Sequence, residues 1–144
     1  MKNPRSYITI IALMLSILSG VTQEMRDGSY RFIGKIEHDG TVRNESYMMI
    51  GRFRKDGTIE DRNYRMAGKI DTDGTVRDRQ YMMIGKVDSD GTVRDRHYRM
   101  IGKVESDGTV RDASYRFIGT AKDIPPRRAA VFFFFALFQN RQSY

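Results

Sequence analysis

Apolar and polar positions along this chain recur every 17 residues. The copy at residues 98–114 reads Tyr-Arg-Met-Ile-Gly-Lys-Val, then Glu-Ser-Asp-Gly, then Thr-Val-Arg-Asp-Ala-Ser. Five full copies occupy residues 30–46, 47–63, 64–80, 81–97 and 98–114, and a half copy lies on either side. A fixed period predicts stacked or ring-arranged copies of one small unit that cannot bury a core alone.

Each copy is predicted to form two short antiparallel strands. The first strand is Tyr-x-Met-Ile-Gly-Lys-Val and the second is Thr-Val-Arg-Asp, with Asp-Gly between them. Glycine at this place accepts the positive φ that a tight hairpin turn requires. Because only two or three residues link one copy to the next, we expect the hairpins to form a continuous meander.

Side chains along a strand alternate between its two faces. One face carries Tyr98, Met100, Gly102 and Val104, and the other carries Arg99, Ile101 and Lys103. The first face is apolar in every copy, so we assign it, tyrosine included, to a common core. Its glycine would let neighbouring backbones approach closely.

The two half copies predict how the domain ends. A two-stranded unit is marginal alone, and the terminal half-strands can complete each other and close a ring, which would remove exposed strand edges. The predicted fold class is therefore all-β, with hairpin repeats in a closed ring-like or petal arrangement over residues 24–121. The number of units stays open: five if the Asp-Gly hairpin is the unit, six if the other hairpin is.

The recurrent Tyr-x-x-Ile-Gly-Lys-Val and Asp-Gly-Thr-Val-Arg-Asp, together with the apolar N-terminal segment described next, resemble the small exported β-flower proteins of Bacteroidetes, of the five-fold type. The resemblance covers about residues 24–121. It implies a petal-like ring of short hairpins and an envelope or extracellular location. It implies no activity.

Both ends of the chain lie outside the repeat. Residues 1–23 have the layout of a secretory signal peptide, with Lys2 and Arg5 before an apolar run over residues 7–18 and small residues after it. We therefore expect export to the periplasm, the outer surface or the medium. The alternative is a retained membrane anchor, although the run is shorter than the roughly 20 residues of a spanning helix.

Residues 122–144 are predicted to form an apolar C-terminal capping segment. Asp123 is the expected N-cap of a short helix or strand, and an unbroken apolar run covers residues 129–138. One interpretation is that this run covers an opening or apolar face of the ring. The other is that it docks on a membrane surface or a partner through Phe132, Phe133, Phe134, Phe135 and Phe138.

Metal and catalytic chemistry find little support in the sequence. The chain has no cysteine, which excludes thiolate sites and disulfides. Aligned as calcium loops, the Asp-Gly turns place a cation at the first ligand position, as at Lys69, and no glutamate at the twelfth. A weak cation site using Asp71 and Asp73 stays open. His38 and His97 stand where other copies carry varied residues. We therefore expect no enzyme and no cofactor.

The repeated polar side chains suggest binding or architecture. Arg43, Arg77, Arg94 and Arg111 recur on the second strand, and the second copy has glutamate there. They form either cross-strand ion pairs on a solvated face or a ring presented to an anionic ligand. The net charge is +7, but acids at nearly every turn argue against nucleic acid.

The repeated tyrosines allow two interpretations as well. They could stack on sugars as a repeated platform, although their place on the apolar face favours core packing. The sequence therefore predicts an exported, non-catalytic structural or binding module of the cell envelope, whose partner would be a glycan or another envelope component. An exposed tyrosine ring would favour glycan binding, and a buried one would weaken it.

Overall fold

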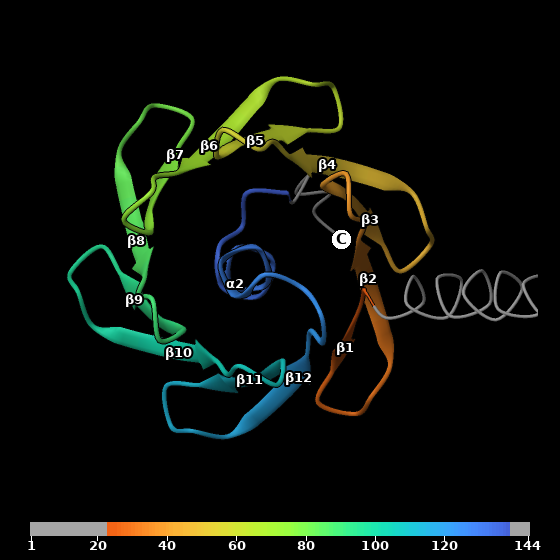
Figure 1. The fold of residues 1–144 in the computed structure, drawn as a ribbon, viewed down its shortest axis with the longest axis vertical. Coiled ribbons are helices and arrows are strands. Elements are labelled where there is room, and N and C mark those ends of the chain that lie inside the picture. The colour runs from red at the N-terminus through yellow and green to blue at the C-terminus, as the bar shows by residue number, and fades with distance from the viewer. Residues whose placement is uncertain (1–22, 139–144) are drawn as a thin grey trace, which may run out of the picture.

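The computed structural model describes residues 23–138, which form a closed ring of short antiparallel strands around one helix (Figure 1). The predicted signal peptide lies outside the described residues, as does the end of the tail after residue 138. The twelve strands are β1 (Glu24–Asp27), β2 (Phe32–Ile36), β3 (Thr41–Asn44), β4 (Met49–Phe53), β5 (Thr58–Asp61), β6 (Met66–Ile70), β7 (Thr75–Asp78), β8 (Met83–Val87), β9 (Thr92–Asp95), β10 (Met100–Val104), β11 (Thr109–Asp112) and β12 (Phe117–Thr120). Every strand pairs with its sequence neighbours, and β1 pairs with β12.

Asp-Gly turns join β2 to β3 and then every second pair of strands. In the turn between β10 and β11, the Gly108 N–H donates to the Glu105 carbonyl at 3.0 Å, and Gly108 has a φ of 91°. The Asp107 carboxylate accepts the backbone N–H of Thr109 at 2.9 Å. The five turn glycines all have φ between 89° and 92°. The predicted positive φ at these glycines is therefore confirmed.

The link between copies forms a second turn of the same hydrogen-bonded pattern, with tyrosine in place of glycine. The Tyr98 N–H donates to the Asp95 carbonyl at 3.0 Å, and Tyr98 has a φ of 62°. The Asp95 carboxylate accepts the backbone N–H groups of His97 and Arg99. Each such hairpin, with its two strands, forms one outward loop of the ring in Figure 1, which we call a petal.

The half copies at the two ends close the ring. Arg26 of β1 pairs with Thr120 of β12, and Asp27 pairs with Gly119. The first petal is therefore β1–β2 and the last is β11–β12, so the ring has six petals (Figure 1). Five seams between petals carry an Asp-Gly turn, and the β1–β12 pair forms the sixth seam without a covalent link. The ring thus contains five Asp-Gly hairpins and six tyrosine hairpins, which are the two numbers of units that the sequence left open.

A β-bulge in each petal overturns the predicted alternation of faces. In β10, Met100 and Gly102 lie opposite adjacent residues of β9, so Ile101 is an extra residue. Beyond the bulge, Gly102 and Val104 are buried as predicted. Before it the faces change: Ile101 packs against the core, and Tyr98 is 59 % exposed. The assignment of the tyrosines to the core is therefore wrong.

The C-terminal segment forms a helix, α2 (Pro126–Phe134), that stands in the middle of the ring (Figure 1). It begins with proline at its first position, which suits a helix N-terminus. Pro125, not the predicted Asp123, is the N-cap. Ala129, Ala130 and Val131 are fully buried in the core.

Six apolar side chains of this segment each lie against a different glycine of the ring. The pairs are Phe132 with Gly34, Phe138 with Gly51, Leu137 with Gly68, Phe135 with Gly85, Phe134 with Gly102, and Phe133 with Gly119. At each of these glycines a Cβ atom would come within 3 Å of that side chain and of a backbone carbonyl oxygen on the neighbouring strand. The absence of a side chain at these glycines thus makes room for the apolar side chains inside the ring.

Candidate functional site

The inside of the ring is occupied by the chain itself. Phe135 and Phe138 are 8 % and 9 % exposed, and Phe132, Phe133 and Phe134 pack against the same core. The structure thus places all five predicted docking residues inside the ring, against its glycines. No helix among residues 23–138 has the length and apolar content to cross a bilayer.

The four predicted ligand-facing arginines lie one to a petal seam, and each makes two contacts. Their Nε atoms donate to an acid of the preceding Asp-Gly turn at 2.7–2.9 Å. Their Nη1 atoms donate to the carbonyl of the following tyrosine at 3.1–3.3 Å. The residues concerned are Arg43, Arg77, Arg94 and Arg111, whose side chains are 33–35 % exposed. These arginines hold the tyrosine turns in shape, and ligand binding by them stays a prediction.

The second copy carries the same ion pair with its charges exchanged. Glu60 occupies the arginine position, and Arg54 occupies the position of the acid. Their side chains meet at 3.4 Å, with Glu60 buried to 7 % exposure. The turn at Tyr64 therefore lacks the arginine that holds the tyrosine carbonyl in other copies.

The most exposed repeated feature is a ring of tyrosines at the petal tips. We call these residues the tyrosine girdle: Tyr30, Tyr47, Tyr64, Tyr81, Tyr98 and Tyr115. Their exposure is 57–65 %, and their φ values are 61–64°. The left-handed conformation costs a non-glycine residue about 1–2 kcal/mol. Glycine fills the equivalent place in the Asp-Gly turns, so the girdle retains six tyrosine side chains at an energetic cost.

Several girdle rings lie against the neighbouring petal. The Tyr47 ring stacks on Phe32 with centroids 5.0 Å apart and 19° between planes. The ring centroids of Tyr30 and Phe117 are 5.4 Å apart, and the Tyr64 hydroxyl lies 3.8 Å from Met49 Sδ. Such contacts restrict the rings while leaving more than half of each tyrosine exposed.

Apolar and charged side chains follow the tyrosines at the tips. Met48 and Met82 are 59 % and 65 % exposed. In three other petals the next residue is an arginine that pairs with an aspartate of its own turn at 3.1–3.3 Å. An aromatic face flanked by polar groups suits a sugar ring, because its C–H face packs on the aromatic ring while hydroxyls find hydrogen-bond partners.

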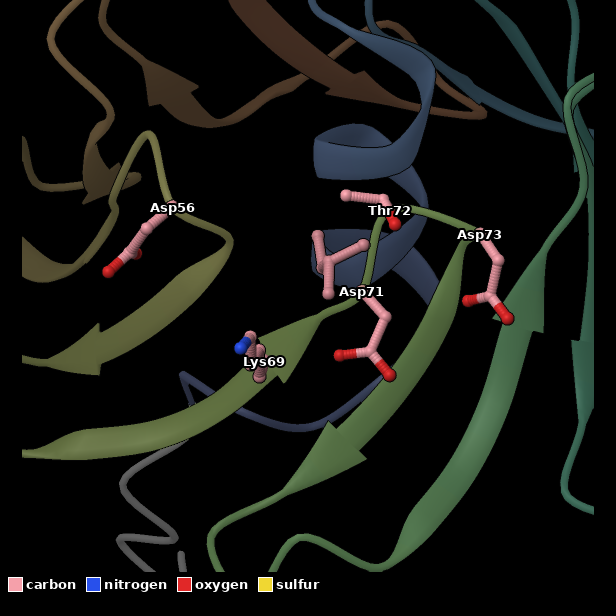
Figure 2. A pocket seen from close by; sticks show the side chains of 6 residues that line it. Asp56, Lys69, Asp71, Thr72 and Asp73 are labelled. Atoms are coloured by element: carbon pink, nitrogen blue, oxygen red, sulfur yellow. The ribbon is translucent and has the colours of Figure 1, made fainter.

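Two neighbouring Asp-Gly turns border a hollow of about 390 Å³. Figure 2 shows Asp56 on one Asp-Gly turn and Asp71, Thr72 and Asp73 on the next. Asp71 pairs with Arg77 at 2.8 Å. The Thr75 N–H donates to Asp73 and holds the pKa of that carboxyl below its usual range. These acids thus stabilise the turns. No group of three or more metal-binding residues occurs within residues 23–138.

Both histidines lie exposed on turns. His38 Nδ1 lies 2.9 Å from Gln23 Nε2, and His97 lies next to Arg96 in a petal tip. Neither belongs to a buried cluster of catalytic type. The signal that sequence reasoning missed is the tyrosine turn: Asp95 stands three residues before Tyr98, as Glu105 does before Gly108.

Comparison with known proteins identifies one family. A family model described as 5-fold beta-flower protein matches residues 22–137, most of the chain. No curated protein and no solved structure matches the chain. The family is defined by a structural fold, and its model covers the ring and the helix inside it.

Proposed function

We propose that this chain, which belongs to the 5-fold beta-flower protein family, is an exported, non-catalytic binding module of the cell envelope whose tyrosine girdle binds glycans. The observation that carries the proposal is the exposure of all six girdle tyrosines, at 57–65 %, in a backbone conformation that disfavours tyrosine. A residue kept against its conformational preference at a repeated exposed place points to a role for its side chain.

The rest of the molecule supports a binding module rather than a catalyst. Most of its polar side chains repeat from copy to copy and stabilise turns, as Asp107 does through the Thr109 N–H. Six similar platforms around one ring suit a ligand that also repeats, because several weak contacts to one polymer add by avidity. The N-terminal segment supports export, and an exported module meets glycans in the envelope.

Docking through the C-terminal segment is the weaker alternative. Its aromatic side chains would have to leave the glycines of the ring, as Phe134 would leave Gly102. Each buried phenylalanine contributes roughly 1.5–3 kcal/mol through its apolar surface. Docking in this way would therefore expose the core of the ring.

An array of printed neutral and acidic oligosaccharides tests the proposal. We expect the full chain to bind, and we expect a variant with Tyr47→Asn, Tyr81→Asn and Tyr115→Asn to lose most of the signal. Asparagine tolerates the left-handed conformation, so this variant should fold. The matched control changes the same three tyrosines to phenylalanine and should retain most of the binding. Absence of binding, or equal binding by the asparagine variant, would refute the proposal.

A further inference from the structure

One petal departs from the repeat in its charges. In the β5–β6 petal, Arg62 and Arg65 flank the exposed Tyr64, as the equivalent arginines flank Tyr98 in the β9–β10 petal. The arginine that elsewhere holds the tyrosine carbonyl is replaced by Glu60, which pairs with Arg54. A feature that breaks the repeat is a better candidate for specific recognition than one that every copy shares.

The ion pairs of this petal also differ from those of its counterparts. In the β9–β10 petal, the residue after the tyrosine, Arg99, pairs with Asp95 of its own turn at 3.3 Å. The β1–β2 and β11–β12 petals contain the same pair. In the β5–β6 petal the equivalent aspartate, Asp61, pairs instead with Arg79 of the next petal at 3.2 Å. Within the described part of the chain, the Arg65 guanidinium has no carboxylate partner.

Arg65, together with Arg79 of the next petal, thus places positive charge near the turn of one girdle tyrosine, Tyr64. We define the arginine site as Tyr64, Arg65 and Arg79. All three residues are exposed, and Asp61 pairs with Arg79. A guanidinium presents its N–H groups as a planar fork that matches a carboxylate or phosphate. The adjacent aromatic ring offers the stacking surface for a sugar.

We infer that the arginine site selects an acidic saccharide, with Arg65 binding the anionic group and Tyr64 stacking on the sugar ring. This inference rests on the proposed function and deepens it, since it names the class of glycan and the petal that recognises it. The other five petals then add weaker contacts along the same polymer.

A titration of the full chain with tetragalacturonate, with maltotetraose as the neutral probe, tests the inference. The chain has no tryptophan, and six of its eight tyrosines belong to the girdle, so tyrosine fluorescence reports mainly on the girdle. We expect Arg65→Gln to weaken tetragalacturonate binding about tenfold, since a charge-assisted hydrogen bond is lost. The matched control, Arg99→Gln, removes an arginine from the same position of another petal and should change the affinity less than twofold.

The possible outcomes distinguish failure of the acidic specificity from failure of the proposed function. Equal binding of both probes with no effect of Arg65→Gln would overturn the acidic specificity while leaving glycan binding by the girdle intact. Equal losses in Arg65→Gln and Arg99→Gln would also overturn it, because net charge rather than this site would then govern affinity. Failure of the wild-type chain to bind either probe, together with a blank array, would refute the proposed function itself.

Discussion

Replacing Gly102 by alanine tests whether the tail is the core of the ring. The added Cβ would overlap Phe134 Cζ and would lie 2.7 Å from the Arg111 carbonyl oxygen. Neither contact is tolerable between heavy atoms, so the aromatic ring and the neighbouring strand must move. Overpacking of this kind costs about 1–3 kcal/mol. At about 4–8 °C per kcal/mol for a small domain, the midpoint of thermal unfolding should fall by roughly 5–20 °C.

Urea denaturation followed by far-UV circular dichroism measures this loss, and Gly28 supplies the control. At Gly28 the nearest heavy atom to an added Cβ is 3.5 Å away, so Gly28→Ala should change the free energy of unfolding by less than about 0.5 kcal/mol. Adding Phe134→Leu to Gly102→Ala should cost less than the sum of the two single changes, because the smaller side chain frees space. If Gly102→Ala is as stable as Gly28→Ala, the helix does not occupy the ring as described.

Three further predictions concern the turns. At Tyr81, whose φ is 64°, Tyr81→Gly should be more stable than Tyr81→Ala by about 1 kcal/mol in urea denaturation, and equal stability would mean that the turn is not left-handed. The pKa of Asp73 lies below its usual range because the Thr75 N–H donates to it. Its contribution to stability is thus present above about pH 4 and lost as the pH falls through the folded value. Unfolding midpoints in urea should decrease below pH 4, less so in Asp73→Asn. Glu60→Arg should lower the thermal unfolding midpoint by placing like charges together, and adding Arg54→Glu should recover most of the loss by restoring the ion pair of the other copies.

Much of the ring follows from the sequence period alone. The Asp-Gly turns, the meander and the closing of the half copies on each other are all present. These features depend on local turn chemistry and on the need to cover strand edges, both of which are visible in one copy. The length of the repeat therefore carries information about the whole architecture.

The placement of the tyrosines could not be obtained by counting alternate positions. The bulge at Ile101 shifts the alternation by one residue, which moves Tyr98 from the predicted core to the outside. Nothing in the apolar pattern marks the bulge, because methionine, isoleucine and tyrosine are all acceptable on either face. The one available signal was the spacing from Asp95 to Tyr98, which matches the spacing from Glu105 to Gly108 in the other turn.

The filling of the ring and the asymmetry of its charges depend on three-dimensional packing. The apolar run of the tail favoured a covering role, but the pairing of Phe134 with Gly102, and of each other side chain with its own glycine, follows from the geometry of a helix inside a ring. Likewise, the pairing of Asp61 with Arg79 joins residues 18 apart on adjacent petals. Neither contact can be predicted from the sequence of one copy.

Glycan binding by the tyrosine girdle is tested most directly by nuclear magnetic resonance of the tyrosine side chains. With tyrosine and phenylalanine rings labelled, the chain would be titrated with the oligosaccharide that binds best on the array. We predict that resonances of the six girdle tyrosines shift with ligand, while those of the phenylalanines inside the ring, such as Phe135, stay in place. Shifts confined to the buried phenylalanines, or binding that leaves the tyrosine resonances unchanged, would contradict the account.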